Sequence, residues 1–359
     1  MITTIVAFII LLGILIFFHE LGHFLVAKAS GVMVLKFSLG FGPSIIKKKI
    51  GETEYMISAL PLGGYVKMLG EGKQNGEEMI MPVDPSRSFE AKPLRIKAAI
   101  VAAGPAFNLV LAFFIYVLVS WIGIPTLSPV IGEVQEKTPA YDAGLMKGDK
   151  IVLINSSPVK EWEDIPSIMS NNQTGKLNIV IERNGTQFKV EVRPKIVSAK
   201  NLFGENINRP LIGISPSGET FITRYGPISG LGYGINQCWW VVKMTGIAFS
   251  KIIEGTVPIK ESLGGPIMIA QVSGKSFKAG LLPFLGLIAF ISINLAIINI
   301  LPIPVLDGGY ILIFLIEGII RRPLKDKPKE IAQQIGLFIL ILLMLFAFYN
   351  DIARIIAGK

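Results

Sequence analysis

The stretch Phe17-Phe18-His19-Glu20-Leu21-Gly22-His23 lies inside an apolar run that extends from Ile2 to Ala27. In a helix, residues four apart share one face, so the imidazoles of His19 and His23 can both reach a single metal ion. Glu20 then stands beside that ion as a candidate base for a water molecule. An ionisable side chain at the centre of a bilayer costs roughly 2.5–3.5 kcal/mol. Three such groups in one turn therefore call for a compensating partner, and a divalent cation would be one.

The H-E-x-x-H pattern is short, and a surface helix could carry it by chance without consequence. An apolar helix could not do so cheaply, because each polar group would lose its water. His19 and His23 are also the only histidines in the chain. We therefore favour a metal site over a chance match.

The composition bounds the class of protein. Of 359 residues, 51% are hydrophobic and only 17% are charged, which excludes an ordinary soluble globular protein. We expect a multi-pass α-helical membrane protein with one inserted soluble domain. The net charge of +9 would suit nucleic acid, but the basic residues cluster beside hydrophobic spans, where membrane orientation explains them better. The expected partner is thus the lipid bilayer and not nucleic acid.

Four apolar segments are each long enough to cross roughly 30 Å of hydrocarbon. The expected spans are residues 1–27, 96–122, 280–320 and 335–356. The third is interrupted by Pro302-Ile303-Pro304-Val305-Leu306-Asp307-Gly308-Gly309, which cannot continue a helix. Irregular backbone at membrane depth is tolerated only where protein or a water-filled cavity satisfies its polar groups. This pattern predicts a broken helix beside a site.

Charge bias predicts the orientation of the chain. Lysines and arginines are concentrated in residues 28–95, between the first two spans, and in the short connection before the fourth. Both segments are expected to be cytoplasmic by the positive-inside rule. The large segment 123–280 is then extracytoplasmic, and its own lysines count little because long domains cross the membrane regardless of charge.

A hairpin-like pattern follows the first span. Ser44–Lys47 and Tyr55–Ser58 flank a turn at Gly51-Glu52, and a further strand-like run, Gly63–Lys67, comes next. Two interpretations are equally open. The segment could be a small membrane-associated cytoplasmic or re-entrant sheet, or its edge strand could pair with the extended backbone of a substrate.

Residues 125–196 have the pattern of a compact α+β domain. Short β-type runs at Val130–Val134 and Lys150–Ile154 precede a hairpin closed by Asn184-Gly185, and Ile165–Met169 is the expected helix. Residues 197–279 are expected to form a linker and an amphipathic helix at the outer membrane interface. A buried core helix would show the same pattern.

Together these residues closely resemble the site-2 protease family of intramembrane zinc metalloproteases, in particular its bacterial regulator-of-sigma-E branch. The resemblance covers nearly the whole chain and begins with the motif His19–His23. The other matching motifs are Phe37–Pro43, Pro61–Met68, Ala103–Asn108 and Asn299–Gly308. Pro139–Leu145 and Lys147–Asp149 are similar to the signature of PDZ domains in this family, which identifies residues 125–196 as an extracytoplasmic PDZ domain.

The resemblance implies a zinc site in which Asp307 joins His19 and His23, with Glu20 as the catalytic base. An acid in an apolar region at a helix break agrees with that assignment, although Asp307 could instead cap the following helix. Asn294 and Asn299 match family asparagines near the catalytic centre and the substrate. Their alternative role is hydrogen bonding between transmembrane helices.

The resemblance also implies a function. The family cleaves transmembrane segments of single-span proteins, such as anti-sigma factors or remnant signal peptides, in regulated intramembrane proteolysis in the bacterial cytoplasmic membrane. A strand containing Gly63, Gly64 and Tyr65 would hold the unwound substrate by β-addition. The PDZ domain would bind peptide C-termini or filter substrates by size. Only one PDZ module is evident, and Tyr310 stands where many relatives carry histidine.

Two other classes of function fit part of the pattern. A catalytically inactive membrane scaffold would recruit partners through the PDZ domain, but the intact set of His19, Glu20, His23 and Asp307 argues against it. A metal transporter would also place histidine and aspartate at mid-membrane. Transport calls for a continuous polar pathway, whereas the second and fourth spans carry almost no ionisable residues.

Overall fold

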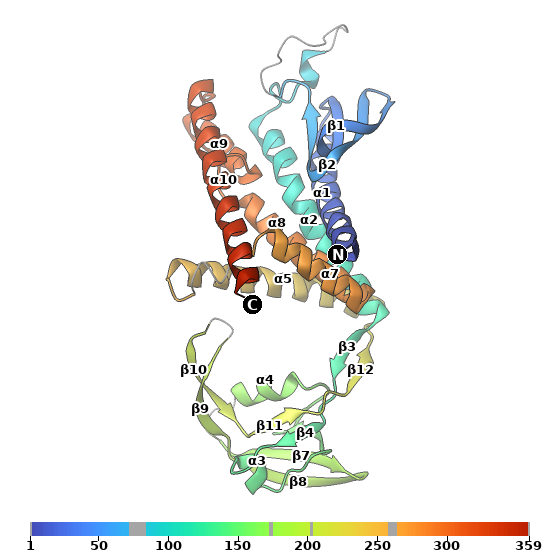
Figure 1. The fold of residues 1–359 in the computed structure, drawn as a ribbon, viewed down its shortest axis with the longest axis vertical. Helices are drawn as coiled ribbons and strands as arrows, with labels where there is room; N and C mark the ends of the chain where they lie inside the picture. Colours follow the sequence, from blue (N-terminus) through green and yellow to red (C-terminus); the bar gives the residue numbers. More distant parts are fainter. Residues whose placement is uncertain (1, 72–83, 172–174, 202–203, 258–263, 358–359) are drawn as a thin grey trace. The chain divides into compact units, whose positions relative to one another are not determined.

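The computed structural model describes residues 2–71, 84–171, 175–201, 204–257 and 264–357. Among these residues, four helices are long and apolar enough to cross a membrane. They are α1 (Ile2–Ala29), α2 (Leu94–Ile122), α8 (Leu281–Ile300) and α10 (Asp326–Ile356), drawn in Figure 1. The four apolar spans expected from the sequence are therefore helices in the structure. α10 differs in its start, because it begins at Asp326 rather than at 335.

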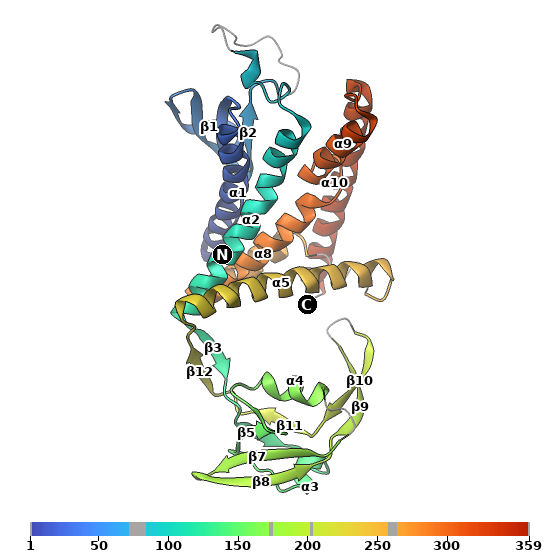
Figure 2. The ribbon, with the colours of Figure 1, turned by 180° about the vertical axis from the view of Figure 1, so that it is seen from behind.

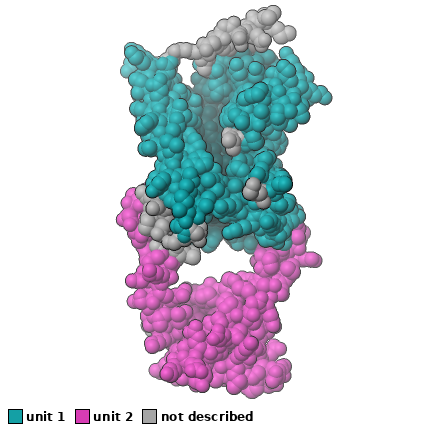
Figure 3. Space-filling view, viewed as in Figure 1, with its two compact units in different colours: residues 1–119, 230–247, 259–359 teal, residues 120–229, 248–258 magenta. Residues whose placement is uncertain are grey.

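The chain divides into two compact units, coloured separately in Figure 3. Unit 1 consists of Met1–Val119, Gly230–Ile247 and Ile259–Lys359, and unit 2 of Ser120–Ser229 and Ala248–Pro258. The helix α5 (Pro227–Ile253) contributes residues to both. All four long apolar helices lie wholly or mainly in unit 1.

Three of the long helices share one apolar core in unit 1. Figures 1 and 2 show α1 and α2 side by side. The core between α1, α2 and α8 includes Leu11, Leu15, Leu111, Ile115, Ile288 and Ile293. Because these helices meet through buried side chains, they hold the polar residues of α1 at a fixed place.

The sheet after α1 is built from β1 (Val34–Ile50) and β2 (Thr53–Met68). Lys49 lies opposite Glu54 across the Gly51 turn, so the hairpin expected from the sequence is present. Ser38, in the first half of β1, lies opposite both Met56 and Tyr65. The end of β2 therefore pairs with β1 along one edge only, and no other strand among the described residues pairs with its second edge. A 3-10 turn, Pro85–Arg87, precedes α2.

Unit 2 contains a four-stranded sheet over a small apolar core. Alternate residues of its central strand β7, namely Leu177, Ile179 and Ile181, point into this core, and Ile165 and Met169 of α4 cover it. The sheet order is β6 (Ser157–Pro158), β5 (Lys150–Ile154), β7 (Leu177–Arg183) and β8 (Thr186–Val192). The helices of this module are α3 (Pro139–Asp142) and α4 (Asp164–Ser170). These elements agree with the strands and helix expected within residues 125–196.

The C-terminal boundary of this module lies beyond residue 196. β4 (Ile131–Val134) pairs with β11 (Ile214–Pro216), and Ile212 is buried in the same core as Ile131. The sequence placed β11 in a linker because a three-residue strand carries no periodic signal of its own. Two further ladders complete unit 2, β3 (Ile124–Leu127) with β12 (Thr220–Thr223) and β9 (Lys195–Lys200) with β10 (Asn206–Leu211).

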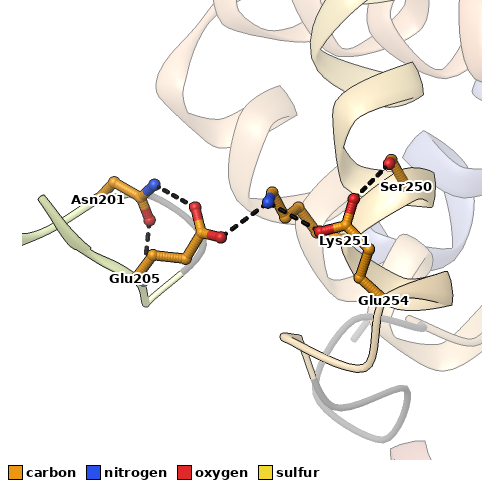
Figure 4. Close-up of polar contacts among 5 residues, drawn as sticks. All are labelled: Asn201, Glu205, Ser250, Lys251 and Glu254. Carbon is orange, nitrogen blue, oxygen red and sulfur yellow. Dashed lines mark hydrogen bonds and ion pairs between the residues drawn. The ribbon is translucent and has the colours of Figure 1, made fainter.

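A polar cluster joins the β9–β10 hairpin to the last turn of α5 within unit 2. The Lys251 ammonium contacts the carboxylates of Glu205 (2.8 Å) and Glu254 (2.9 Å). Asn201 orients Glu205, because its side-chain amide donates to that carboxylate at 2.8 Å, and Ser250 donates to Glu254 at 2.9 Å. Figure 4 shows Lys251 between the two carboxylates.

The last helix also anchors a shorter one in unit 1. The buried Asp351 carboxylate of α10 accepts backbone N–H groups of Gly265, Ile267 and Met268 at 2.8–3.0 Å. These donors belong to the start of α7 (Pro266–Ala279), whose first N–H groups have no partner within the helix. Asp351 therefore caps α7 from a neighbouring helix.

Candidate metal centre

α1 presents two imidazoles to one point. His19 and His23 lie one helical turn apart, with side chains 13% and 12% exposed. Their Nε2 atoms are 3.3 Å apart. Glu20 is half-buried on the same turn. The spacing of the motif thus produces the convergence that the sequence predicted.

The chain breaks between α8 and α9 (Asp307–Ile320), as its prolines predict. Val305 in this break has φ +89°, a conformation that a β-branched residue rarely adopts. Such backbone costs of the order of 1–3 kcal/mol and is found mostly at functional sites. Leu306 is the N-cap of α9 in an extended conformation, and no side chain caps this end by a hydrogen bond. Asp307 is therefore the first helical residue, and its carboxylate is not used as a cap.

The Asp307 carboxylate completes the cluster. Its Oδ2 atom lies 3.3 Å from His19 Nε2, and its Oδ1 atom lies 3.6 Å from His23 Nε2. Ligand atoms about 2.0–2.1 Å from a tetrahedral zinc ion lie about 3.3–3.4 Å from one another. The two Nε2 atoms have this separation, and Asp307 Oδ2 lies at the same distance from His19 Nε2. In addition, Asp307 Oδ2 is buried without a hydrogen-bond partner, which a cation would satisfy.

Residues of α2 contact the Nδ1 atoms of both imidazoles. His23 Nδ1 lies 2.9 Å from the carbonyl oxygen of Ile100, and His19 Nδ1 lies 3.3 Å from the side-chain nitrogen of Asn108. Gly104 lies between these two positions, and a Cβ atom added to it would be 2.3 Å from His23 Nε2. Sequence reasoning gave these three residues no role at the centre. The available signals were the family motif Ala103–Asn108, which contains two of them, and the lone amide of Asn108 in an apolar span.

The strand β2 passes close to Glu20 at Gly64. A Cβ atom added to Gly64 would be 2.8 Å from Glu20 Cγ, so the strand passes the catalytic candidate with no side chain between them. Tyr65 stacks on Phe41 with ring centroids 6.3 Å apart, and Gly63 is in direct contact with the same Phe41 ring. The substrate-binding role of Gly63, Gly64 and Tyr65 stays a prediction.

The two asparagines of α8 differ in their surroundings. Asn294 Oδ1 accepts the Thr245 hydroxyl of α5 at 3.1 Å, and its Nδ2 donates to the Phe290 carbonyl at 2.8 Å. The contact with Thr245 is a hydrogen bond between helices, the alternative role that the sequence left open, whereas the contact with Phe290 lies within α8. Asn299 lies half-buried in the last turn before the break. A role for either residue in substrate binding stays a prediction.

Comparisons with known proteins agree with a metalloprotease. The model of Peptidase family M50 matches residues 7–343. A protein of Campylobacter jejuni is 38% identical over 351 residues, covering 98% of this chain and 93% of that protein. A protein of Clostridium acetobutylicum is 35% identical, covering 97% of each chain. Both relatives carry the name "Putative zinc metalloprotease".

Two solved structures match a smaller part of the chain. The PDZ domain of an SdrC-like protein from Listeria monocytogenes is 19% identical with a TM-score of 0.20, covering 24% of this chain and 84% of that domain. The corresponding domain from Listeria innocua is 20% identical with a TM-score of 0.20, covering 26% and 96%.

Proposed function

This chain belongs to Peptidase family M50, and from that premise we propose that it is a zinc endopeptidase cleaving the transmembrane segments of single-span proteins. Family membership supports a metalloprotease in a membrane protein, and the proposal adds the zinc ion, the substrate class and the site of cleavage. Anti-sigma factors and remnant signal peptides are the substrates that this class of activity would take. The process would then be regulated intramembrane proteolysis.

One observation carries the proposal. Three ligand atoms from α1 and α9, two elements far apart in the sequence, lie within 4.8 Å of one another. Glu20 lies on the same helical turn as two of them. Buried acids and imidazoles without a cation would be costly in an apolar helix bundle. A metal centre with an adjacent general base explains all four side chains at once.

The chemistry follows from the residues present. A zinc ion held by His19, His23 and Asp307 would acidify a water molecule and polarise a peptide carbonyl. Glu20 takes a proton from the attacking water as general base and returns it to the leaving amine as general acid. The single carboxylate serves both steps because the proton it gains in the first is the one it gives up in the second.

The unpaired edge of β2 is proposed to hold the substrate. A transmembrane helix hides its peptide carbonyls in internal hydrogen bonds, so it must unwind before attack. The freed N–H and C=O groups need partners in an apolar environment. The edge at Gly63–Tyr65 offers such partners beside Glu20, and its glycines let an extended chain approach closely.

The placement of the PDZ module is part of the proposal. Basic residues concentrated at 28–95 favour a cytoplasmic location for that segment and an extracytoplasmic location for unit 2, in a bacterial cytoplasmic membrane. Cys238 is the only cysteine, so a Cys238→Ser background permits single-cysteine labelling. In intact cells, an impermeant maleimide should label Lys189→Cys but not Lys48→Cys. The opposite pattern contradicts the orientation.

The activity is tested with the purified chain in liposomes and a tagged single-span protein as substrate. We expect cleavage within the span by the parent chain. We expect no cleavage by Glu20→Gln, which cannot accept a proton, nor after treatment with a zinc chelator. Metal content is measured in parallel, and Glu20→Gln should retain it because Glu20 is not a ligand.

Two results would contradict the proposed activity or the proposed role of Glu20. Stoichiometric metal with no cleavage of several trimmed substrates would favour a catalytically inactive scaffold that recruits partners through its PDZ module. Cleavage that survives Glu20→Gln would assign the general base to another residue.

A further inference from the structure

Asn108 is a polar side chain in an unusual place. It is fully buried in the apolar helix α2. Its main-chain carbonyl accepts the hydroxyl of Ser292 at 2.8 Å, which fixes this turn of α2 against α8. Its side-chain oxygen is buried without a hydrogen-bond partner. A buried acceptor in that state costs about 1–3 kcal/mol and calls for an explanation.

The tautomer of His19 suggests an explanation for the unpartnered oxygen of Asn108. A neutral imidazole that offers Nε2 to a metal carries its proton on Nδ1. With His19 Nε2 offered to the proposed metal beside Asp307, the proton lies on Nδ1, which then requires an acceptor. The group 3.3 Å from Nδ1 is the Asn108 amide nitrogen, which is itself a donor.

Turning the Asn108 amide by 180° brings its oxygen to His19 Nδ1 and moves its nitrogen to the position that the unpartnered oxygen occupied. The oxygen and nitrogen of an amide are nearly equal in shape, and their assignment follows from the hydrogen bonds they make. In the turned position Oδ1 accepts the proton of His19 Nδ1. The buried oxygen then gains a donor, and two donors no longer face each other.

His23 shows the same arrangement with a partner whose role is fixed. Its Nδ1 lies 2.9 Å from the carbonyl oxygen of Ile100, which can only accept. His23 therefore carries its proton on Nδ1 and leaves Nε2 free. α2 thus supplies an acceptor to each imidazole, a main-chain oxygen for His23 and a side-chain oxygen for His19.

We propose that Asn108 is a positioning residue whose side-chain oxygen accepts the Nδ1 proton of His19 and so directs Nε2 toward the metal. The proposal rests on the metal centre proposed above. Partners of this kind fix the tautomer and orientation of a ligand, and their loss typically weakens metal binding 10–100-fold.

The test measures zinc affinity of the purified full chain by competition with a chromophoric chelator. Asn108→Leu, which removes the acceptor, should weaken binding about 10–100-fold. Asn108→Asp, which can accept but not donate, should bind within a few-fold of the parent. The matched control is Asn350→Leu, since Asn350 is another buried asparagine in a long apolar helix and its side chain has no hydrogen-bond partner. This control should leave zinc affinity unchanged.

The absorption spectrum of the cobalt-substituted protein gives a second readout. Asn108→Leu should alter the ligand-field bands, whereas Asn108→Asp and Asn350→Leu should preserve the parent spectrum. Equal zinc affinity for the parent and Asn108→Leu overturns the proposal. So does an Asn108→Asp chain that melts normally yet binds as weakly as Asn108→Leu, since Asn108 would then act as a donor. If the parent chain itself binds no zinc, the proposed function fails rather than this assignment alone.

Discussion

Gly104 faces both imidazoles across a gap with no room for a methyl group. A Cβ atom added there would lie 2.3 Å from His23 Nε2 and 2.8 Å from His19 Cε1. Neither ring can retreat freely, because each is also held through its Nδ1 atom by α2. The space for the two imidazoles therefore depends on Gly104, although Gly104 is not itself a proposed ligand.

We expect Gly104→Ala to lower zinc affinity and protease activity together. Overpacking of this kind costs about 1–3 kcal/mol, and here it would displace the nitrogens that bind the metal. Gly13→Ala is the control, because Gly13 lies in α1 and a Cβ atom added there meets nothing within 4 Å. Competition with a chelator and thermal unfolding are measured for both variants. Parent-like zinc affinity in Gly104→Ala would show that the rings move aside.

The sequence identified some residues of the centre and missed others for a physical reason. The spacing of His19 and His23 is a local property, because helical geometry alone brings residues four apart together. Asp307 is distant in the chain, and it was marked by the family motif Asn299–Gly308 and by its place at a break in an apolar segment. Asn108 carries no local signal for its proximity to His19, because that contact depends on how α1 and α2 pack.

At the scale of whole elements, the sequence predicted the elements that have strong local signals and did not predict the short ones. The apolar length of α1 and α2 and the Asn184-Gly185 turn predicted helices and a hairpin that the structure contains. β11 has only three residues, so nothing in its own sequence shows that it pairs with β4. The start of α10 was missed because its first turns are polar, and hydropathy detects only the apolar part of a helix.

The contact between the β9–β10 hairpin and α5 should depend on pH. Hydrogen bonds from the Lys251 ammonium and the Asn201 amide hold the pKa of Glu205 below its ordinary value of 4.5. A carboxylate with a lowered pKa stabilises the folded contact fully above that ordinary value and loses its contribution as pH falls through the lower one. We therefore expect the hairpin to loosen on acidification below about pH 4.5.

Hydrogen exchange measures this effect directly. The amide of Glu205 donates to Asn201 Oδ1 at 3.0 Å, so its protection factor reports the integrity of the hairpin end. Protection should fall as the pH is lowered, and the fall should be smaller in Lys251→Met, where the charge partner is missing. Glu254 also contacts Lys251, so Glu254→Gln should retain the pH dependence of the Glu205 contact. An identical pH dependence in the parent and Lys251→Met would exclude the ion pair as its cause.

At the scale of the whole molecule, the proposed metal ligands and the core of the β module belong to different units. His19, His23 and Asp307 all lie in unit 1, whereas the buried core from Ile131 to Ile212 lies in unit 2. Ile131, Ile151 and Ile179 are fully buried in that core, which has its own sheet and its own helix to cover it. A ligand that binds one unit should therefore stabilise that unit and leave the other unchanged.

Removing the metal should accordingly lower one thermal transition of the full chain and not the other. A ligand present at 100 times its Kd stabilises the folded state by about 2.7 kcal/mol, which corresponds to roughly 5–10 °C for a unit of this size. In calorimetry of the detergent-solubilised protein, a chelator should shift the transition of unit 1 downward, and added zinc should restore it. Substituting Ile179→Ala should shift only the transition of unit 2, because it leaves a cavity in that core costing about 2–5 kcal/mol. His19→Ala supplies the control, since its unit 1 transition should already be low and insensitive to the chelator. A chelator effect of equal size on both transitions would mean that the two units unfold as one. The proposed metal would then stabilise unit 2 as well as unit 1.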